Sequence, residues 1–165
     1  MWKESFKNLA ALGIALAIVG AVIAGALMLG DSARSERNDN GVLTKKGNVN
    51  ALEIVVGDCY QDNPKTTELS SVSAVPCDQP HTAQVYGVFT YPDASTERPD
   101  RNTLLDAIRP GCAALRQTAV DDGKMPTGAA GSELIPDAAS WLLGRHDSLC
   151  VVTSGTAWTG TVLKA

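Results

Sequence analysis

The chain has 165 residues, 44% of them hydrophobic, and a formal net charge of −4, which allows one ordinary domain and a short additional segment. From Ala51 to the C-terminus there are 8 Lys or Arg and 14 Asp or Glu residues, a net charge of −6. This negative charge argues against nucleic acid or an anionic lipid surface as the main ligand of that part, because both need clustered positive charge.

An apolar segment runs from Leu9 to Leu29 without a charged residue. A helix of these 21 residues is about 31 Å long, which matches a hydrocarbon core of about 30 Å. We therefore expect a single transmembrane helix over residues 9–29, preceded by a cytoplasmic stub of residues 1–8.

The alternative to a membrane anchor is a cleaved signal peptide. Lys3 and Lys7 form a basic start, and Ala24-Gly25-Ala26 offers a small-x-small cleavage pattern. Signal h-regions span about 7 to 15 residues, however, and here the apolar run continues past that pattern. An uncleaved anchor is therefore the better interpretation.

The apolar segment also carries a stripe of small residues. They recur at i to i+4 spacing and are Gly13, Ala17, Ala21 and Gly25. Such a stripe lets a second helix approach closely, as in small-xxx-small dimers. An Ala/Gly-rich helix also produces stripes by chance, so packing against a partner membrane helix stays a hypothesis.

A polar stretch separates the apolar segment from the first candidate strand. Residues 30–50 show neither helical nor strand periodicity, so we expect a flexible stalk. A flexible chain of about 20 residues spans roughly 25 Å. The domain, beginning at Ala51, should therefore stay near the membrane.

The cysteines indicate the compartment. All four follow the apolar segment, and they are Cys59, Cys77, Cys112 and Cys150. An even number of widely spaced cysteines predicts two disulfides, which persist in oxidising surroundings. Zinc is disfavoured because structural zinc ligands usually come in close pairs. We expect the N-terminus in the cytoplasm and the domain on the extracytoplasmic side of the cell membrane.

Hydrophobic periodicity predicts several short strands and one helix beyond residue 50. The expected strands cover residues 52–60, 70–77, 81–91, 133–136 and 149–154, with an edge strand at 159–163, and the expected helix covers 102–123. In the third strand, period-two spacing places four side chains on one buried face: Ala83, Val85, Phe89 and Tyr91.

The helix has a recognisable start and core face. Asn102 or Thr103 is the expected N-cap, and Asp106 favours the first turn. One face carries Leu105, Ile108, Cys112, Leu115 and Ala119. Pro110 is expected to kink or split the helix, because it removes a backbone donor. A helix packed on a mainly antiparallel sheet, an α+β fold, accounts for this order of elements.

We predict that the disulfides join Cys59 to Cys77 and Cys112 to Cys150. The first would link two strands that are adjacent in sequence. The second would fix the helix to the sheet, because Cys150 shares a strand face with Val152. In the chain-entropy model each bond contributes roughly 3 to 4 kcal/mol.

Several of these residues together resemble the septum formation domain family of actinobacterial membrane proteins. The resemblance covers about residues 54–163 and rests on Gly57-Asp58-Cys59, on Val75-Pro76-Cys77-Asp78-Gln79-Pro80-His81 with Val85, and on Trp141, Gly144-Arg145 and Cys150. It implies a membrane helix followed by an exterior domain, and an association with septum formation but no chemistry. The chain departs from the family pattern at Gln84, where the family often has an acidic residue.

His81 is the strongest candidate for chemistry, because it lies close in sequence to a cysteine. A disulfide at Cys77 would remove the thiolate that a Cys-His mechanism requires, so we expect His81 to bond a backbone carbonyl. A two-His metal site that combines His146 with Asp58 or Asp147 is the less favoured alternative.

The remaining chemical motifs favour no catalytic site. No Gly-x-Ser-x-Gly motif, phosphate-binding loop or dinucleotide fingerprint occurs, and Asp121-Asp122 fits a solvated helix end. Trp141 and Trp158 are expected in the core rather than in a binding surface. We therefore expect that the protein is not an enzyme and that it has no catalytic residues, no metal-binding residues and no cofactor.

Three functional hypotheses remain. The first is a non-enzymatic interaction module of the cell envelope, associated with septum formation or cell division, whose partners are other envelope or membrane proteins or cell-wall material. The second is an accessory subunit of a larger membrane complex, docked through its transmembrane helix. The third is a small envelope hydrolase. The sequence does not identify the ligand.

Overall fold

The computed structural model of the chain describes residues 35–62, 71–92 and 97–164. Among these residues, no helix is long and apolar enough to cross a membrane. The predicted stub, the apolar segment at residues 9–29 and its small-residue stripe all lie outside the described ranges.

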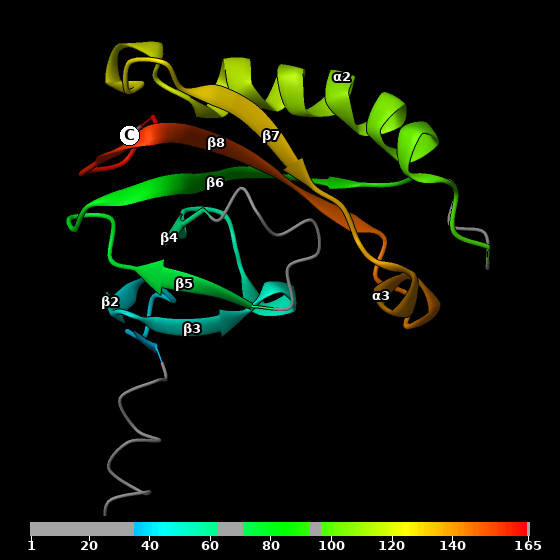
Figure 1. Cartoon of the computed structure of the whole chain (residues 1–165), viewed down its shortest axis with the longest axis horizontal. Coiled ribbons are helices and arrows are strands. Elements are labelled where there is room, and N and C mark those ends of the chain that lie inside the picture. The colour runs from blue at the N-terminus through cyan, green and yellow to red at the C-terminus, as the bar shows by residue number, and fades with distance from the viewer. Residues whose placement is uncertain (1–34, 63–70, 93–96, 165) are drawn as a thin grey trace, which may run out of the picture. The chain divides into compact units, whose positions relative to one another are not determined.

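Short strands and two α-helices make up the described part of the chain (Figure 1). The strands are β1 (Glu36–Arg37), β2 (Leu43–Lys45), β3 (Gly47–Asn50), β4 (Cys59–Gln61), β5 (Ser71–Val75), β6 (His81–Thr90), β7 (Ala130–Leu134) and β8 (Asp147–Trp158). The helices are α2 (Arg101–Ala119), α3 (Ala138–Leu142) and the 3-10 turns η1 (Ala51–Glu53) and η2 (Asp122–Lys124).

Six of these strands form one antiparallel sheet in the order β3-β5-β4-β6-β8-β7, while β1 and β2 form a separate hairpin. The main helix α2 runs along one side of β6, β8 and β7, with β3 and the hairpin on the opposite side (Figure 1). The predicted α+β domain of antiparallel sheet with one main helix is confirmed.

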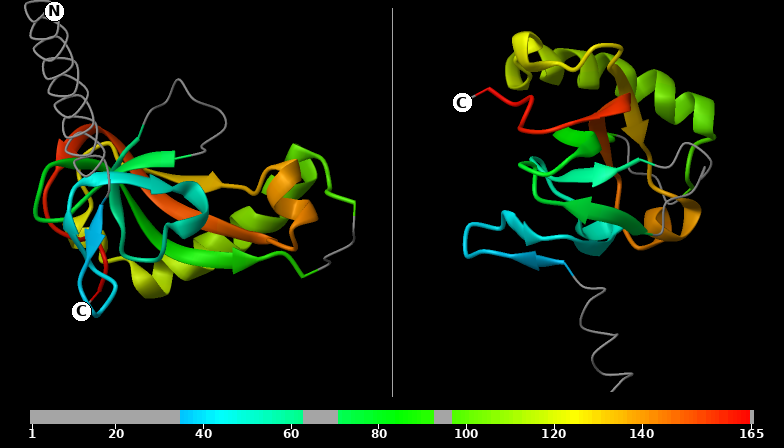
Figure 2. Two further views of the ribbon diagram at one scale, coloured as in Figure 1. Left: turned by 90° about the horizontal axis from the view of Figure 1, so that it is seen from below. Right: turned by 60° about the vertical axis from the view of Figure 1, so that its left-hand side comes forward.

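The sheet curls strongly, so that both of its faces are buried. One hydrophobic cluster unites Val49 of edge strand β3, Val85 of β6 and Val151 of β8, and Leu134 of the other edge strand, β7, packs against it. A second cluster lies on the helix side and joins Leu104 and Ile108 of α2 to the sheet. The two views in Figure 2 show the β3-β5-β4 half turning across the face opposite α2.

The central strand β6 changes which face it buries along its length. Its pairing with β8 shifts register between Val85 and Gly87. Val85 therefore lies in the first cluster, whereas Phe89 and Tyr91 pack against the second. The prediction that these side chains share one face is wrong, because an extra residue in a bulge reverses the alternation.

The helix α2 begins and ends slightly earlier than predicted. Asp100, not Asn102 or Thr103, is the N-cap, and its carboxylate accepts hydrogen bonds from both of their backbone N–H groups. The helix is continuous through Pro110. The predicted core face is confirmed, since Leu105, Ile108 and Cys112 are buried.

Residues 36–50, which the sequence analysis assigns to a flexible stalk, form β1, β2 and β3 instead. Asn40 and Gly41 lie in the turn between β1 and β2, where Gly41 has a φ of 76°. Leu43 and Val49 are buried in the first cluster and so fix these strands to the sheet. The compact domain therefore begins at Ser35, not at Ala51.

Two other predicted strands are shorter or absent in the structure. Residues 52–60 contribute only the short strand β4, because a 3-10 turn and a loop around Gly57 precede it. Residues 159–163 form no strand, and Leu163 makes only an isolated bridge to Val120.

Both predicted disulfides are confirmed. Cys59 bonds Cys77 with a Cα–Cα distance of 5.3 Å, and Cys112 bonds Cys150 with a Cα–Cα distance of 5.4 Å. The first joins β4 to the end of β5, and the second joins α2 to β8. Two disulfides in a domain of this size indicate an oxidising, extracytoplasmic environment.

Candidate functional site

The loop before β4 carries the Gly57-Asp58-Cys59 motif and lies against the central strand. Gly57 adopts a φ of 97°, a conformation that side-chain-bearing residues rarely adopt. Its N–H donates to the Val85 carbonyl at 2.9 Å, and the Val85 N–H donates to the Asp58 carbonyl at 3.0 Å. These bonds hold the motif on β6, so that Cys59 reaches Cys77.

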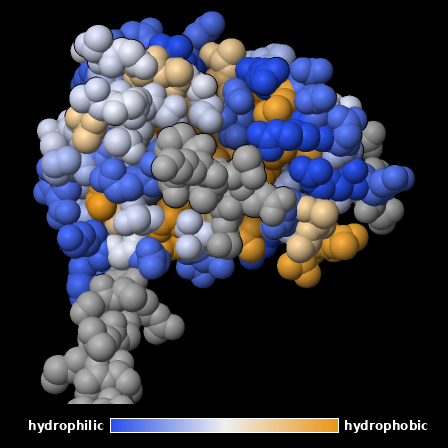
Figure 3. All heavy atoms as spheres, in the orientation of Figure 1, coloured by the Kyte–Doolittle hydropathy of each residue, from blue (hydrophilic) through white to orange (hydrophobic). Residues whose placement is uncertain are grey.

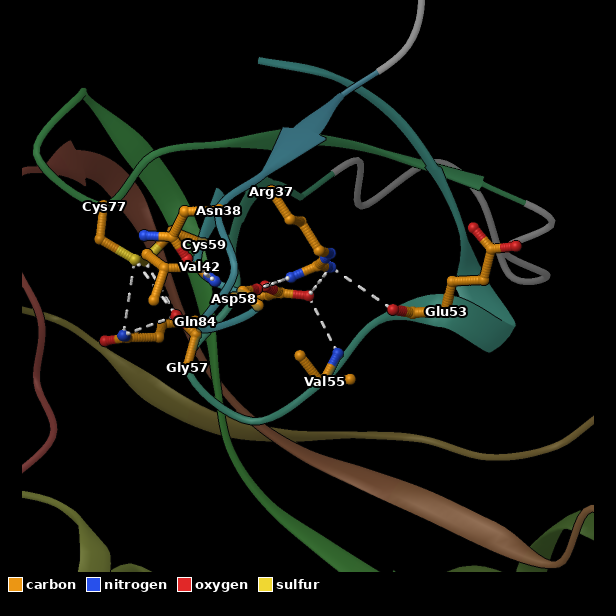
Figure 4. Close-up of polar contacts among 11 residues, drawn as sticks. Arg37, Asn38, Val42, Glu53, Val55, Gly57, Asp58, Cys59, Cys77 and Gln84 are labelled. Atoms are coloured by element: carbon orange, nitrogen blue, oxygen red, sulfur yellow. Dashed lines mark hydrogen bonds and ion pairs between the residues drawn. A yellow bond between two sulfur atoms is a disulfide. The ribbon is translucent and has the colours of Figure 1, made fainter. Parts of the chain in front are cut away.

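The Asp58 carboxylate is buried and pairs with an arginine of the β1–β2 hairpin (Figure 4). The Arg37 guanidinium donates two hydrogen bonds to it, at 2.7 and 2.6 Å, in a bidentate arrangement. The Val55 N–H donates a third bond to the same carboxylate at 2.9 Å. The hydrogen bond to Asp58 raises the pKa of Arg37 above its ordinary value. This pair therefore fixes the hairpin to the motif loop.

Gln84 connects the same loop to the C-terminal segment. It is fully buried, its side-chain carbonyl accepts from the Val162 N–H at 2.8 Å, and its amide donates to the Thr161 hydroxyl at 2.8 Å and to the Gly57 carbonyl at 3.4 Å. An amide both donates and accepts, whereas a carboxylate only accepts. The glutamine at this position therefore makes a contact to Gly57 that an ionised acidic residue could not make.

A groove of about 190 Å³ lies between the hairpin and the motif loop. It is lined by Asn40, Gly41, Val42, Leu43, Val55, Val56, Gly57, Asp58, Cys59 and Cys77. Three of the lining valines are unusually exposed for large apolar residues: Val42 at 59%, Val55 at 48% and Val56 at 47%. The groove can therefore accept an apolar side chain. Cys59, Cys77 and Asp58 are among its lining residues, so the Cys59–Cys77 disulfide and the Arg37–Asp58 ion pair stabilise it.

His81 lies away from the groove entrance and is fully buried. Its Nδ1 lies 2.8 Å from the Gln79 carbonyl, as predicted, and its ring centroid lies 4.4 Å from that of Trp158. Burial lowers the pKa of His81, which favours the neutral ring. Because Cys77 is bonded to Cys59, the structure brings no thiolate to this histidine.

The alternative two-His metal site is wrong. His81 begins β6, whereas His146 lies beside its far end, where the Tyr91 N–H donates to the His146 carbonyl at 3.1 Å. The two ends of this 10-residue strand are nine positions apart in sequence, a distance of roughly 30 Å. Asp58 is held by Arg37, and the Asp147 carboxylate accepts from Thr90. Within the described ranges, no group of three or more His, Cys, Asp or Glu could hold a metal ion.

Trp141 and Trp158 both belong to the core, as predicted. Trp141 is 2% exposed, and Trp158 packs against the helix-side cluster.

The sequence analysis missed the residues that build the groove. Arg37 and Val42 were assigned to the stalk, and Val55 and Val56 to a strand. The Asn40-Gly41 pair is a favoured hairpin turn and could have indicated that this region is ordered.

A family model described as septum formation matches residues 35–153 of the chain, more than half of its length. The match begins where the compact domain begins and includes the hairpin. No curated protein shows a significant similarity to the chain, and neither does any solved structure.

Proposed function

The chain belongs to the septum formation family, and on that premise we propose that it is a non-enzymatic interaction module of the cell envelope. The proposal has three parts. A single transmembrane helix at residues 9–29 anchors the chain with its N-terminus in the cytoplasm. The disulfide-bonded domain lies on the extracytoplasmic side of the cell membrane. Its groove binds another envelope or division protein.

The observation that carries this proposal is the groove beside the Cys59–Cys77 disulfide. Soluble domains seldom leave several large aliphatic side chains exposed around one hollow, and such places commonly bind a partner. The exposed valines Val42, Val55 and Val56 supply apolar contact area. We infer that the partner inserts an aliphatic side chain there, because the exposed surface offered at the groove is mainly apolar.

The frame of the groove supports the same proposal. The Arg37–Asp58 ion pair holds the hairpin wall of the groove against the motif loop, and the Cys59–Cys77 disulfide holds the motif loop against the end of β5. Because both walls are fixed, little conformational entropy is lost when a partner binds. The motif residues Gly57, Asp58 and Cys59 serve this frame and have no reactive group free for chemistry, since Asp58 is paired and Cys59 is bonded.

Crosslinking in intact cells followed by affinity purification tests the groove. Val56→Glu places a charge on a groove wall and should abolish recovery of the partner, because a charge in an apolar contact is costly to desolvate. Val88→Glu is the matched control, since Val88 is exposed to a similar extent, 41%, and lies on β6 outside the groove lining. Equal recovery with both variants would refute the groove as the binding site.

Native gel analysis after mild detergent extraction separates this module from an accessory subunit. A monomer or dimer supports the module, whereas a stoichiometric large assembly supports the subunit. Turnover of cell-wall fragments that disappears in His81→Ala would instead support a hydrolase.

A further inference from the structure

The side of the domain that carries the β1–β2 hairpin also carries an exposed leucine pair. Leu142 and Leu143, at the end of α3, are 78% and 75% exposed, the two highest values among the large apolar residues that the structure describes. Figure 3 shows the resulting apolar projection over α3, at the lower right. Exposed leucines of this kind indicate an interaction surface.

The short helix α3 holds these leucines in a fixed position. Trp141, one residue earlier, is buried in the helix-side cluster. The helix ends at Leu142 with Leu143 as its C-cap, and Gly144 in the turn that follows has a φ of 76° and donates its N–H to the Trp141 carbonyl at 2.9 Å. The helical turn therefore directs Trp141 into the core and the two leucines into solvent.

A third exposed leucine lies on η1, to which a side chain that follows α3 is hydrogen-bonded. Leu52 of η1 is 42% exposed, and its carbonyl accepts a hydrogen bond from the Arg145 guanidinium at 3.2 Å. The end of α3 is thus tied to η1, which directly follows β3. Leu142 and Leu143 form what we call the leucine patch.

The place where the domain begins limits what the leucine patch can face. The apolar segment ends at Leu29, and the compact domain begins at Ser35. A fully extended chain advances at most about 3.6 Å per residue, so that these two residues lie within about 20 Å of each other. A domain of about 130 residues has a diameter of roughly 35 Å. With the apolar segment in a bilayer, the parts of the domain that lie farthest from β1 cannot reach the membrane surface.

The leucine patch lies on the side of the domain near β1. In Figure 1 and in the right panel of Figure 2, the hairpin, β3 and α3 lie along one side of the domain, and α2 lies along the other. We propose that the leucine patch inserts into the interface of the lipid bilayer in which the chain is anchored. This inference rests on the membrane anchor of the proposed function.

An apolar insertion agrees with the charge of the domain. Residues 35–165, which make up the domain, carry 11 Lys or Arg and 16 Asp or Glu, a net charge of −5, which would repel an anionic lipid surface if binding depended on charge alone. Leucine side chains enter the interface through the hydrophobic effect, and this contact should not weaken as salt is added. The patch therefore holds one side of the domain on the membrane. The side that carries α2 then faces away from the membrane.

Tryptophan substitution in the full chain tests this proposal. Wild type, Leu143→Trp and Ala114→Trp, the last on the exposed face of α2, are reconstituted into vesicles of phosphatidylcholine and phosphatidylglycerol with brominated acyl chains. The fluorescence that Leu143→Trp adds over wild type should be shifted to the blue and quenched by bromine, at low and high salt alike. The fluorescence that Ala114→Trp adds should be neither shifted nor quenched, because α2 lies on the other side of the domain.

Alkaline carbonate extraction of the same vesicles separates the two proposals. Release of the wild-type chain would overturn the anchor and this inference together. Retention of the chain with unquenched fluorescence in Leu143→Trp, and also in Leu142→Trp, would overturn only the inference. In that case the patch would not contact lipid.

Discussion

Replacing Arg37 with methionine tests whether the hairpin is fixed by its ion pair with Asp58. The Asp58 side chain is 5% exposed and would lose its counter-charge, while keeping one hydrogen bond from Val55. Removing one partner of a buried pair costs about 3 to 5 kcal/mol. The Arg37 side chain is 25% exposed, so that water screens the pair, and we expect a loss of about 2 to 3 kcal/mol in the free energy of unfolding.

Urea unfolding of the full chain in detergent micelles, followed by tryptophan fluorescence, measures this loss. Lys45→Met is the matched control in the same hairpin, because Lys45 pairs with Glu36 at 2.8 Å with side chains 46% and 64% exposed. Exposed pairs contribute less than about 1 kcal/mol. If Arg37→Met lowered stability no more than Lys45→Met, the ion pair would not hold the hairpin.

Three further variants test the core. Replacing Cys112 and Cys150 with alanine should lower the free energy of unfolding by about 4 kcal/mol in the chain-entropy model, because the bond closes a separation of 38 residues. Burial lowers the pKa of His81, so the unfolded state binds its proton more readily, and stability measured by urea should fall from pH 7 to pH 5 in the wild type but less steeply in His81→Phe. In thermal unfolding, Gly111→Ala should destabilise by about 1 to 3 kcal/mol, because the new Cβ would overlap the ring of Phe89.

Each of these expectations has an internal control. Reducing agent should destabilise the wild type more than the variant without Cys112 and Cys150, which keeps only the Cys59–Cys77 bond. The helix-capping carboxylates of Asp100 and Asp137 have a lowered pKa, so their contribution is lost below about pH 4, outside the histidine window. Gly131→Ala should be nearly neutral, since no atom lies within 4 Å of its new Cβ. A stabilising effect of Gly111→Ala, as helix propensity alone would give, would contradict the packing.

The features that the sequence predicted correctly depend on local pattern. The core face of α2 follows from apolar spacing, and the two disulfides follow from the strand and helix that each cysteine belongs to. The contact of His81 with a backbone carbonyl follows from the absence of a free thiol near it.

The features that the sequence did not predict depend on contacts between distant residues. The polar composition of residues 36–50 concealed a hairpin and an edge strand, whose order comes from burying Leu43 and Val49 and from pairing Arg37 with Asp58. The bulge in β6 leaves no signal in an alternating sequence. The groove likewise exists only because the hairpin lies beside a loop that follows it in the chain.

The two disulfides and the extracytoplasmic position of the domain both require oxidising surroundings. Thiol labelling in intact cells tests this requirement directly. A membrane-impermeant maleimide should label none of the four cysteines until a reductant is added, and should then reach them without permeabilisation of the membrane. Labelling without reductant, and only after the membrane has been opened, would show free thiols on the cytoplasmic side. That result would contradict both the disulfides and the extracytoplasmic position of the domain.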